Sequence, residues 1–303
     1  MDLIAITGHT AAGKTVLAAH IAARTGGEII SADSRQVYRH MSIGTGKDYD
    51  DYLVDGVRVP SHLLDIRDPG EHYSLFDFQR DVEQVIVEIR LRGKRPILCG
   101  GTGLYLESVL KSWPLQEVPE DPEFRAASIG KSDEELINLL KSFGPLHNTT
   151  DTTSRDRLLR AIEIAKYQKT VPHKSQKIPN SLVFGVKYER EERRNRITQR
   201  LKQRLNSGMI EEAQLLLQEV TPDQLTYYGL EYKYLTLYCT GQISYDEMFR
   251  RLNIAIHQFA KRQMTWFRGM ETRGIPVIWI PGEWPFQEKI DFIIARMDAG
   301  TIE

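Results

Sequence analysis

The segment GHTAAGKT, residues 8–15, constrains the fold of this chain more than any other part of the sequence. It matches the phosphate-binding P-loop pattern, and most chains with this pattern hydrolyse or transfer phosphate from a nucleoside triphosphate. An apolar run at residues 3–7 precedes it, and an alanine-rich stretch at residues 14–25 follows it. Strand, glycine loop and helix are the context in which loop amides and a helix N-terminus bind phosphate oxygens. We therefore predict a polyphosphate site, although the pattern does not say that the ligand is a nucleotide.

The remaining apolar runs predict a parallel sheet. Runs at residues 28–32, 95–99, 181–188 and 276–280 are typical of strands. Helical patterns lie at residues 76–92, 190–220 and 245–269, and a terminal helix is expected at the end of the chain. Short strands that alternate with helices indicate an α/β fold. The predicted fold is a P-loop NTPase-like parallel sheet flanked by helices.

The sequence changes character between residues 119 and 180. Prolines and polar loops there surround two helical stretches, near residues 133–142 and 155–169. We predict that residues 119–180 form a helical insertion. Residues 1–118 and 181–303 would then form the catalytic core.

Composition narrows the setting of the protein. The chain of 303 residues has a net charge of -1, and its only cysteines are Cys99 and Cys239, too few for a disulfide framework or a cysteine zinc site. No apolar run is long enough for a transmembrane helix, and no signal peptide is recognised. We expect a cytoplasmic, monomeric protein with no membrane partner.

Three residues at predicted strand ends are candidates for one site. Lys14 belongs to the P-loop, Asp33 follows the strand at residues 28–32, and Thr102 follows the strand at residues 95–99. Ligands of open α/β sheets bind at the carboxyl ends of the strands. The Lys14 ammonium is expected on phosphate oxygens and the Thr15 hydroxyl on Mg²⁺. From its position alone, Asp33 is a magnesium ligand, a general base or a turn former.

Basic residues gather in three places on an otherwise neutral chain. Residues 187–204 contain eight lysines or arginines and three glutamates, a local net charge of +5. A second cluster comprises Arg155, Arg157 and Arg160, and a third comprises Lys261, Arg262 and Arg268 with Trp266 among them. Such clusters are either solvated helix faces or contacts to the phosphates of a nucleic acid.

These stretches together resemble the tRNA dimethylallyltransferase family. The resemblance rests on GHTAAGKT, IISADSRQVYRHMSIGTGK, HLLDIRDPGEHYS, CGGTGLYL, RDRLLRAIE and AKRQMTWFR, which occur in the family's order. It implies transfer of a dimethylallyl group from dimethylallyl diphosphate to N6 of the adenosine 3′-adjacent to the tRNA anticodon (position 37), with Mg²⁺ and release of diphosphate. The lack of a cysteine pair for a C-terminal zinc finger favours the bacterial type.

The resemblance also implies roles for individual residues. The P-loop would hold the diphosphate leaving group, Asp33 would act as the general base, and Thr102 and Arg200 would complete the catalytic set. The implied diphosphate-binding residues are Gly8, Thr10, Ala11, Ala12, Gly13, Lys14 and Thr15. The implied tRNA contacts are Asp33, Ser34, Arg35, Gln36, Thr102, Arg125, Asp156, Arg157, Leu158, Leu159 and Arg160.

Some residues depart from the family pattern or receive a structural interpretation. YYGLEYKYL differs from the family's commoner Gly-Tyr-Lys/Arg-Glu order, and His62 is expected to pack or hydrogen-bond. Trp279 and Trp284 are expected in the core or at its edge. Three alternative functions remain from the residues alone: a P-loop kinase, an isoprenyltransferase acting on free AMP or ATP, and a non-catalytic RNA-binding module.

Overall fold

The computed structural model describes residues 3–144, 152, 154–170 and 179–299. The chain divides into two compact units. Unit 1 comprises Met1–Ser112 and Ile178–Glu303, and unit 2 comprises Trp113–Lys177. The bounds of unit 2 are close to those predicted for the helical insertion, residues 119–180.

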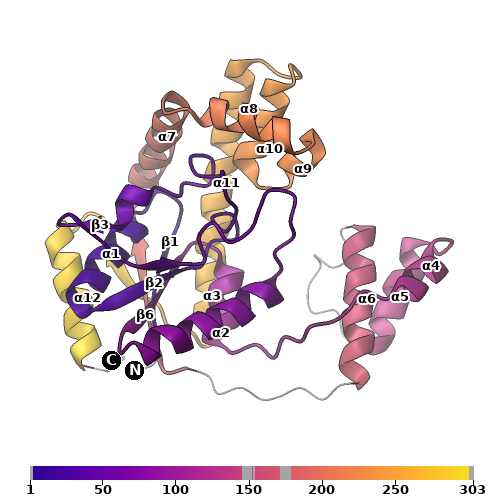
Figure 1. Ribbon diagram of the computed structural model, residues 1–303, viewed down its shortest axis with the longest axis horizontal. Coiled ribbons are helices and arrows are strands. Elements are labelled where there is room, and N and C mark those ends of the chain that lie inside the picture. Colours follow the sequence, from indigo (N-terminus) through magenta and orange to yellow (C-terminus); the bar gives the residue numbers. More distant parts are fainter. Residues whose placement is uncertain (1–2, 145–151, 153, 171–178, 300–303) are drawn as a thin grey trace. The chain divides into compact units, whose positions relative to one another are not determined.

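Unit 1 is built on a parallel sheet with the strand order β5-β2-β6-β1-β7-β8. Figure 1 shows its central strands between layers of helix. The strands are β1 (Leu3–Gly8), β2 (Gly27–Ser31), β5 (Ser61–His62), β6 (Arg95–Gly100), β7 (Ser181–Lys187) and β8 (Ile278–Pro281). A two-stranded hairpin, β3 (Leu53–Val54) and β4 (Val57–Arg58), lies outside this sheet.

Both faces of the sheet are buried, which explains why its strands read as continuous apolar runs. Successive side chains of a strand point to opposite faces, so Leu3 and Ala5 of β1 enter one hydrophobic cluster and Ile4 and Ile6 enter the other. The second cluster includes α1 (Lys14–Thr25) and α12 (Phe286–Ala299). The first includes α2 (Leu75–Leu91), α3 (Gly103–Leu110) and α11 (Tyr245–Thr272).

Further helices extend the first cluster beyond the sheet. The single helical stretch expected at residues 190–220 is two helices, α7 (Arg190–Asn206) and α8 (Met209–Glu219). Gly208, with φ 98°, separates them, because glycine adopts this left-handed backbone without steric cost. The helices α9 (Pro222–Thr226) and α10 (Leu230–Cys239) follow, and a 3-10 helix, η1 (Tyr49–Tyr52), precedes the hairpin.

Unit 2 contains the helices α4 (Pro122–Ser128), α5 (Asp133–Phe143) and α6 (Arg155–Thr170). A small core joins them, formed by Leu136, Leu140, Leu158, Leu159 and Ile162. In the parts of the chain that the structure describes, no helix is both long and apolar enough to cross a membrane.

Candidate active site

The P-loop has the backbone that its glycines permit. Gly13 has φ 75° and caps the N-terminus of α1, whose first residue is Lys14. Gly8 has φ 153°, and a Cβ atom there would lie 2.8 Å from the carbonyl oxygen of Val186 in β7. The loop therefore lies tightly against the sheet, with its amides at the start of a helix, as an anion site requires.

The side chain of Gln263, in α11, hydrogen-bonds to the P-loop. Its side-chain oxygen accepts a hydrogen bond from the Thr10 amide at 2.9 Å, and its Nε2 donates to the Gly101 carbonyl at 2.9 Å. A Cβ atom at Gly101 would lie 2.5 Å from Nε2 of Gln263 and 3.5 Å from Nζ of Lys14. One buried amide thus joins the loop after β1 to the loop after β6.

Asp33 and Thr102 lie where the strand order predicts. Strand β6 lies between β1 and β2, so their carboxyl ends are adjacent. The Ser34 amide donates to the Thr102 hydroxyl at 3.2 Å, and the Arg35 amide donates to Oδ1 of Asp33 at 2.9 Å. Both side chains are held by backbone on the same strand-end loops, beside Lys14. Their catalytic roles stay predictions.

The P-loop carries two basic groups whose pKa values are lowered. Burial lowers the pKa of Lys14, and the nearby Asp33 carboxylate opposes this shift. Burial also lowers the pKa of His9 to about 4, while its hydrogen bond to the Thr10 carbonyl, 2.6 Å from Nδ1, opposes the shift. His9 is therefore neutral at neutral pH, and Nδ1 carries the proton because a carbonyl oxygen only accepts.

An open cleft of about 340 Å³ lies in front of the P-loop. Arginines of α7 form one side of it: Arg196 donates to the Ala11 carbonyl at 3.0 Å, and Arg200 forms an ion pair with Asp48 at 2.9 Å. The charged and hydroxyl side chains that line the cleft are Lys14, Thr15, Asp48, Asp51, Arg196 and Arg200. Positive charge and backbone amides make the cleft suitable for a polyphosphate, and the carboxylates suit a divalent cation.

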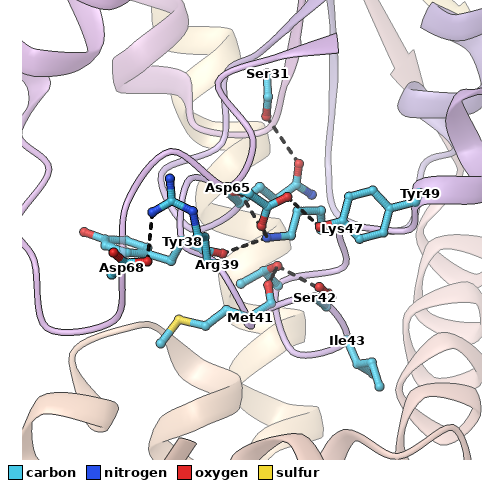
Figure 2. Close-up of polar contacts among 12 residues, drawn as sticks. Ser31, Tyr38, Arg39, Met41, Ser42, Ile43, Lys47, Tyr49, Asp65 and Asp68 are labelled. Carbon is cyan, nitrogen blue, oxygen red and sulfur yellow. Dashed lines mark hydrogen bonds and ion pairs between the residues drawn. The ribbon is translucent and has the colours of Figure 1, made fainter. Parts of the chain in front are cut away.

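The loop after Asp33 is organised around a buried lysine (Figure 2). Lys47 donates to the Tyr38 carbonyl at 2.7 Å and pairs with Asp65. The other carboxylate oxygen of Asp65 accepts from the Tyr49 hydroxyl at 2.5 Å. Gln36 extends this arrangement, since its Nε2 donates to the Gly46 carbonyl at 3.1 Å. The segment from Gln36 to Tyr49 is thus a defined structure beside the site.

Glu212 of α8 anchors the same loop from outside the sheet. Its carboxylate accepts backbone hydrogen bonds from Ser42, Ile43 and Gly44 at 2.8–2.9 Å and one from the Tyr232 hydroxyl at 2.6 Å. Through Glu212 and Tyr232, the helices α8 and α10 therefore help to position the loop that carries Asp48, the ion-pair partner of Arg200.

Unit 2 holds Arg125 and the second basic cluster, to which Arg160 belongs. Arg125 donates to both oxygens of Glu163, at 2.7 and 3.2 Å, and Arg160 donates to Glu163 at 3.1 Å and to the Val118 carbonyl at 2.6 Å. Burial raises the pKa of Glu163, but the hydrogen bonds from Arg125 and Arg160 outweigh it and leave the pKa lowered. Arg125 therefore ties α4 to α6, and Arg160 ties α6 to the segment before α4, in addition to any contact with RNA.

The remaining predicted RNA contacts on α6 differ in exposure. Asp156 and Arg157 are exposed, whereas Leu158 and Leu159 are buried in the core of unit 2. Leu158 is only 1% exposed, so its side chain supports the helix rather than presenting a surface to a ligand.

Comparison with known proteins identifies the family. The sequence model described as IPP transferase matches residues 36–270, and the model described as isopentenyl transferase matches residues 1–62. The chain is 55% identical to tRNA dimethylallyltransferase 2 of Bacteroides fragilis, over 98% of each chain. It is 56% identical to tRNA dimethylallyltransferase 1 of Azobacteroides pseudotrichonymphae, over 92% of each. The chain belongs to the IPP transferase family.

A solved structure agrees with this membership. The crystal structure of the tRNA isopentenylpyrophosphate transferase from Bacillus halodurans superimposes with a TM-score of 0.72 and 33% identity, covering 99% of this chain and 97% of that one. The predicted P-loop NTPase-like fold and the resemblance to tRNA dimethylallyltransferases are thereby confirmed.

Several supports of the site in this IPP transferase were missed from the sequence. Gln263, Lys47, Glu212 and Glu163 each hold a predicted functional segment. Three of them lie in stretches that carry the resemblance: Lys47 in IISADSRQVYRHMSIGTGK, Glu163 in RDRLLRAIE and Gln263 in AKRQMTWFR. Glu212 lies outside these stretches. His62 hydrogen-bonds Glu28 at 2.7 Å, which confirms its structural interpretation, and Trp279 and Trp284 pack against the two cores as expected.

Proposed function

We propose that this IPP transferase moves a dimethylallyl group from dimethylallyl diphosphate to N6 of the adenosine 3′-adjacent to the anticodon in tRNA. The observation that carries the proposal is the meeting of Lys14, Asp33 and Thr102 at three adjacent strand ends. A phosphate loop beside a carboxylate suits a reaction in which an anionic group leaves and a nucleophile loses a proton. The bond from N6 to the allylic carbon forms, and the bond from that carbon to the diphosphate oxygen breaks.

The P-loop would hold the diphosphate as a leaving group. Its amides, the Lys14 ammonium and the Arg200 guanidinium all face the cleft where charge would grow on the departing oxygen. Preorganised donors of this kind stabilise a transition state because they need no reorganisation when the charge appears. Arg200 is already oriented by Asp48.

Asp33 would accept the proton that N6 loses. Its Oδ1 is held by the Arg35 amide, which fixes the carboxylate at the end of β2. Thr102, held by the Ser34 amide, would place its hydroxyl against the target base on the same side. Because the exocyclic amine of adenine is a weak nucleophile, alignment against the allylic carbon contributes at least as much as the base.

The residues around Thr15 fit Mg²⁺. The Thr15 hydroxyl lines the same cleft as the carboxylates of Asp48 and Asp51. Mg²⁺ prefers oxygen ligands and commonly takes one or two carboxylates together with substrate phosphates. Bound there, the ion would neutralise charge on the diphosphate. The described residues contain no cluster of three or more His, Cys, Asp or Glu that could hold a metal by itself, so the substrate would complete the site.

Unit 2 would contribute to tRNA binding through Arg157 and its basic neighbours on α6. The anticodon loop makes it cheap to turn the target base out of its stack. We further propose that the enzyme works as a monomer in the cytoplasm.

Product analysis tests this proposal directly. The full chain is incubated with unmodified tRNA, Mg²⁺ and labelled dimethylallyl diphosphate, and the tRNA is digested to nucleosides. The expected result is label on one adenosine, 3′ to the anticodon and at N6. Label on free AMP but not on tRNA, or no label at all, would refute the proposed substrate or the proposed reaction.

A further inference from the structure

We propose that Arg204 is a second guanidinium for the diphosphate, inward of Arg200 on α7. This inference rests on the proposed function and adds a residue that neither the sequence patterns nor the resemblance single out. Arg204 follows Arg200 by one helical turn, so both side chains leave the same face of α7.

The first observation is that the Nε atom of Arg204 is buried, inaccessible to solvent, and has no hydrogen-bond partner among the described residues. No acidic side chain in the described part of the chain forms an ion pair with it, whereas Arg200 has Asp48. Buried charges are normally paired, because removing them from water is costly. An anionic ligand would remove this cost.

The second observation is the proximity of the two arginines. A Cβ atom added to Gly46 would lie 1.7 Å from Nη2 of Arg204 and 2.9 Å from Nη2 of Arg200. Both guanidinium groups therefore lie beside Gly46. Burial, and then repulsion by Arg200, lower the pKa of Arg204 to about 10, so it stays charged at neutral pH. Two adjacent like charges are favourable only when an anion lies between or beside them.

The third observation is where Arg204 points. It lines a small cavity together with Thr10 and Ala11 of the P-loop, with Arg200, and with Glu231 of α10. Burial raises the pKa of Glu231, and its neighbours include both Arg204 and Asp33. Arg204 therefore borders the P-loop, and Arg200 lines both this cavity and the cleft proposed for the diphosphate.

A guanidinium in this position would donate to the diphosphate and share the negative charge that develops there. Two arginines match a ligand with two phosphate groups, because each guanidinium presents a planar set of donors. Glu231 would keep the empty site from accumulating unbalanced positive charge. The residue that would recognise the ligand is Arg204.

Titration calorimetry with inorganic diphosphate and Mg²⁺ tests the inference without requiring turnover. The variants are Arg204→Gln and, as a matched control, Lys202→Gln at an exposed position of the same helix. Loss of a charge-assisted hydrogen bond should weaken diphosphate binding by about 10- to 100-fold in Arg204→Gln, and Lys202→Gln should bind like the wild type. Arg204→Lys should recover part of the loss, since it keeps the charge but not the planar donors.

A double variant separates ligand binding from a purely structural role. If Arg204 served only to neutralise Glu231, the Arg204→Gln/Glu231→Gln protein would regain wild-type diphosphate affinity. Our inference requires that affinity stay low in the double variant even if its melting temperature recovers. Wild-type affinity in a folded Arg204→Gln protein would overturn the inference alone, whereas a wild-type chain that binds no diphosphate would overturn the proposed function itself.

Discussion

The side-chain oxygen of Gln263 accepts a hydrogen bond from the backbone amide of Thr10 at 2.9 Å, and the two residues are 253 positions apart in the sequence. The same side chain donates to the Gly101 carbonyl, so the P-loop and the Thr102 loop are held by one residue of α11. Two loops from distant parts of the chain are therefore joined through one buried side chain. Such contacts are costly to lose, because the remaining groups stay buried and unpaired.

We predict that Gln263→Ala weakens diphosphate binding. Freed from Gln263, the Thr10 amide and the Gly101 carbonyl lose their partners, which costs about 1–3 kcal/mol for each unsatisfied group. Part of this cost should appear in the melting temperature and part as loss of P-loop order. Gln258→Ala, at an exposed position of the same helix, is the control. Equal diphosphate affinity and equal melting temperature in the two variants would show that the contact is dispensable.

Asp33→Asn distinguishes a general base from a metal ligand. Asparagine keeps the shape and can still hydrogen-bond the exocyclic amine, but it cannot accept a proton. We expect a rate loss of about 10²–10⁴-fold at saturating substrates, with little change in the affinity for diphosphate or Mg²⁺. A large loss of Mg²⁺ affinity in this variant would instead make Asp33 a metal ligand.

Arg200→Ala should slow the chemical step even on a minimal anticodon stem-loop, because Arg200 lines the cleft that holds the leaving group. Single-turnover kinetics at saturating RNA measure this directly. If the variant lost only RNA affinity and kept its single-turnover rate, Arg200 would belong to the RNA interface.

Arg157 and Arg160 should behave differently, although sequence spacing places them together on α6. Removing Arg157, which is exposed, is expected to lower tRNA affinity and reduce the salt dependence of binding by about one phosphate contact. Removing Arg160 should also lower the stability of unit 2, since Arg160 bonds to Glu163 and Val118. Filter binding over a salt series and thermal melting separate the two effects. Lys141→Gln, at an exposed position on α5, is the control.

His9 makes stability depend on pH. The folded-state pKa is about 4 and the ordinary value is 6.5, so the unfolded chain binds the proton first as the pH falls. Stability from His9 is therefore complete above about pH 6.5 and is lost progressively toward pH 4, on the order of 3 kcal/mol by linkage. His9→Asn should flatten the dependence of unfolding free energy on pH across this interval. An unchanged slope would mean that His9 is not held neutral by the fold.

Local sequence patterns predict much of the fold. The helix expected at residues 14–25 is α1. The strand expected at residues 28–32 is β2, shifted by one residue, and the strand expected at residues 95–99 is β6, which is one residue longer. Parallel strands buried on both faces produce continuous apolar runs, which are visible without a structure. The short strand β5 and the helices α9 and α10 were not predicted, because their packing depends on distant segments.

The residues of the site also fall into two groups, those that the sequence predicts and those that it does not. Lys14, Asp33 and Thr102 could be predicted because each follows a recognisable strand, and parallel strands end at one edge of the sheet. Gln263, Glu212 and Arg204 could not, since their importance comes from contacts with loops more than a hundred residues away. The resemblance implies an RNA contact for Arg160, and only its bond to the buried Glu163 reveals a second role.

The central claim is that the P-loop holds a leaving group and that no phosphoryl group is transferred. Its most direct test counts the diphosphate released per adenosine alkylated in unmodified tRNA, with and without ATP. We predict one diphosphate for each N6-dimethylallyl adenosine, with no requirement for ATP and no ADP formed. Dependence on ATP, or formation of ADP or phosphate in step with tRNA modification, would contradict the account.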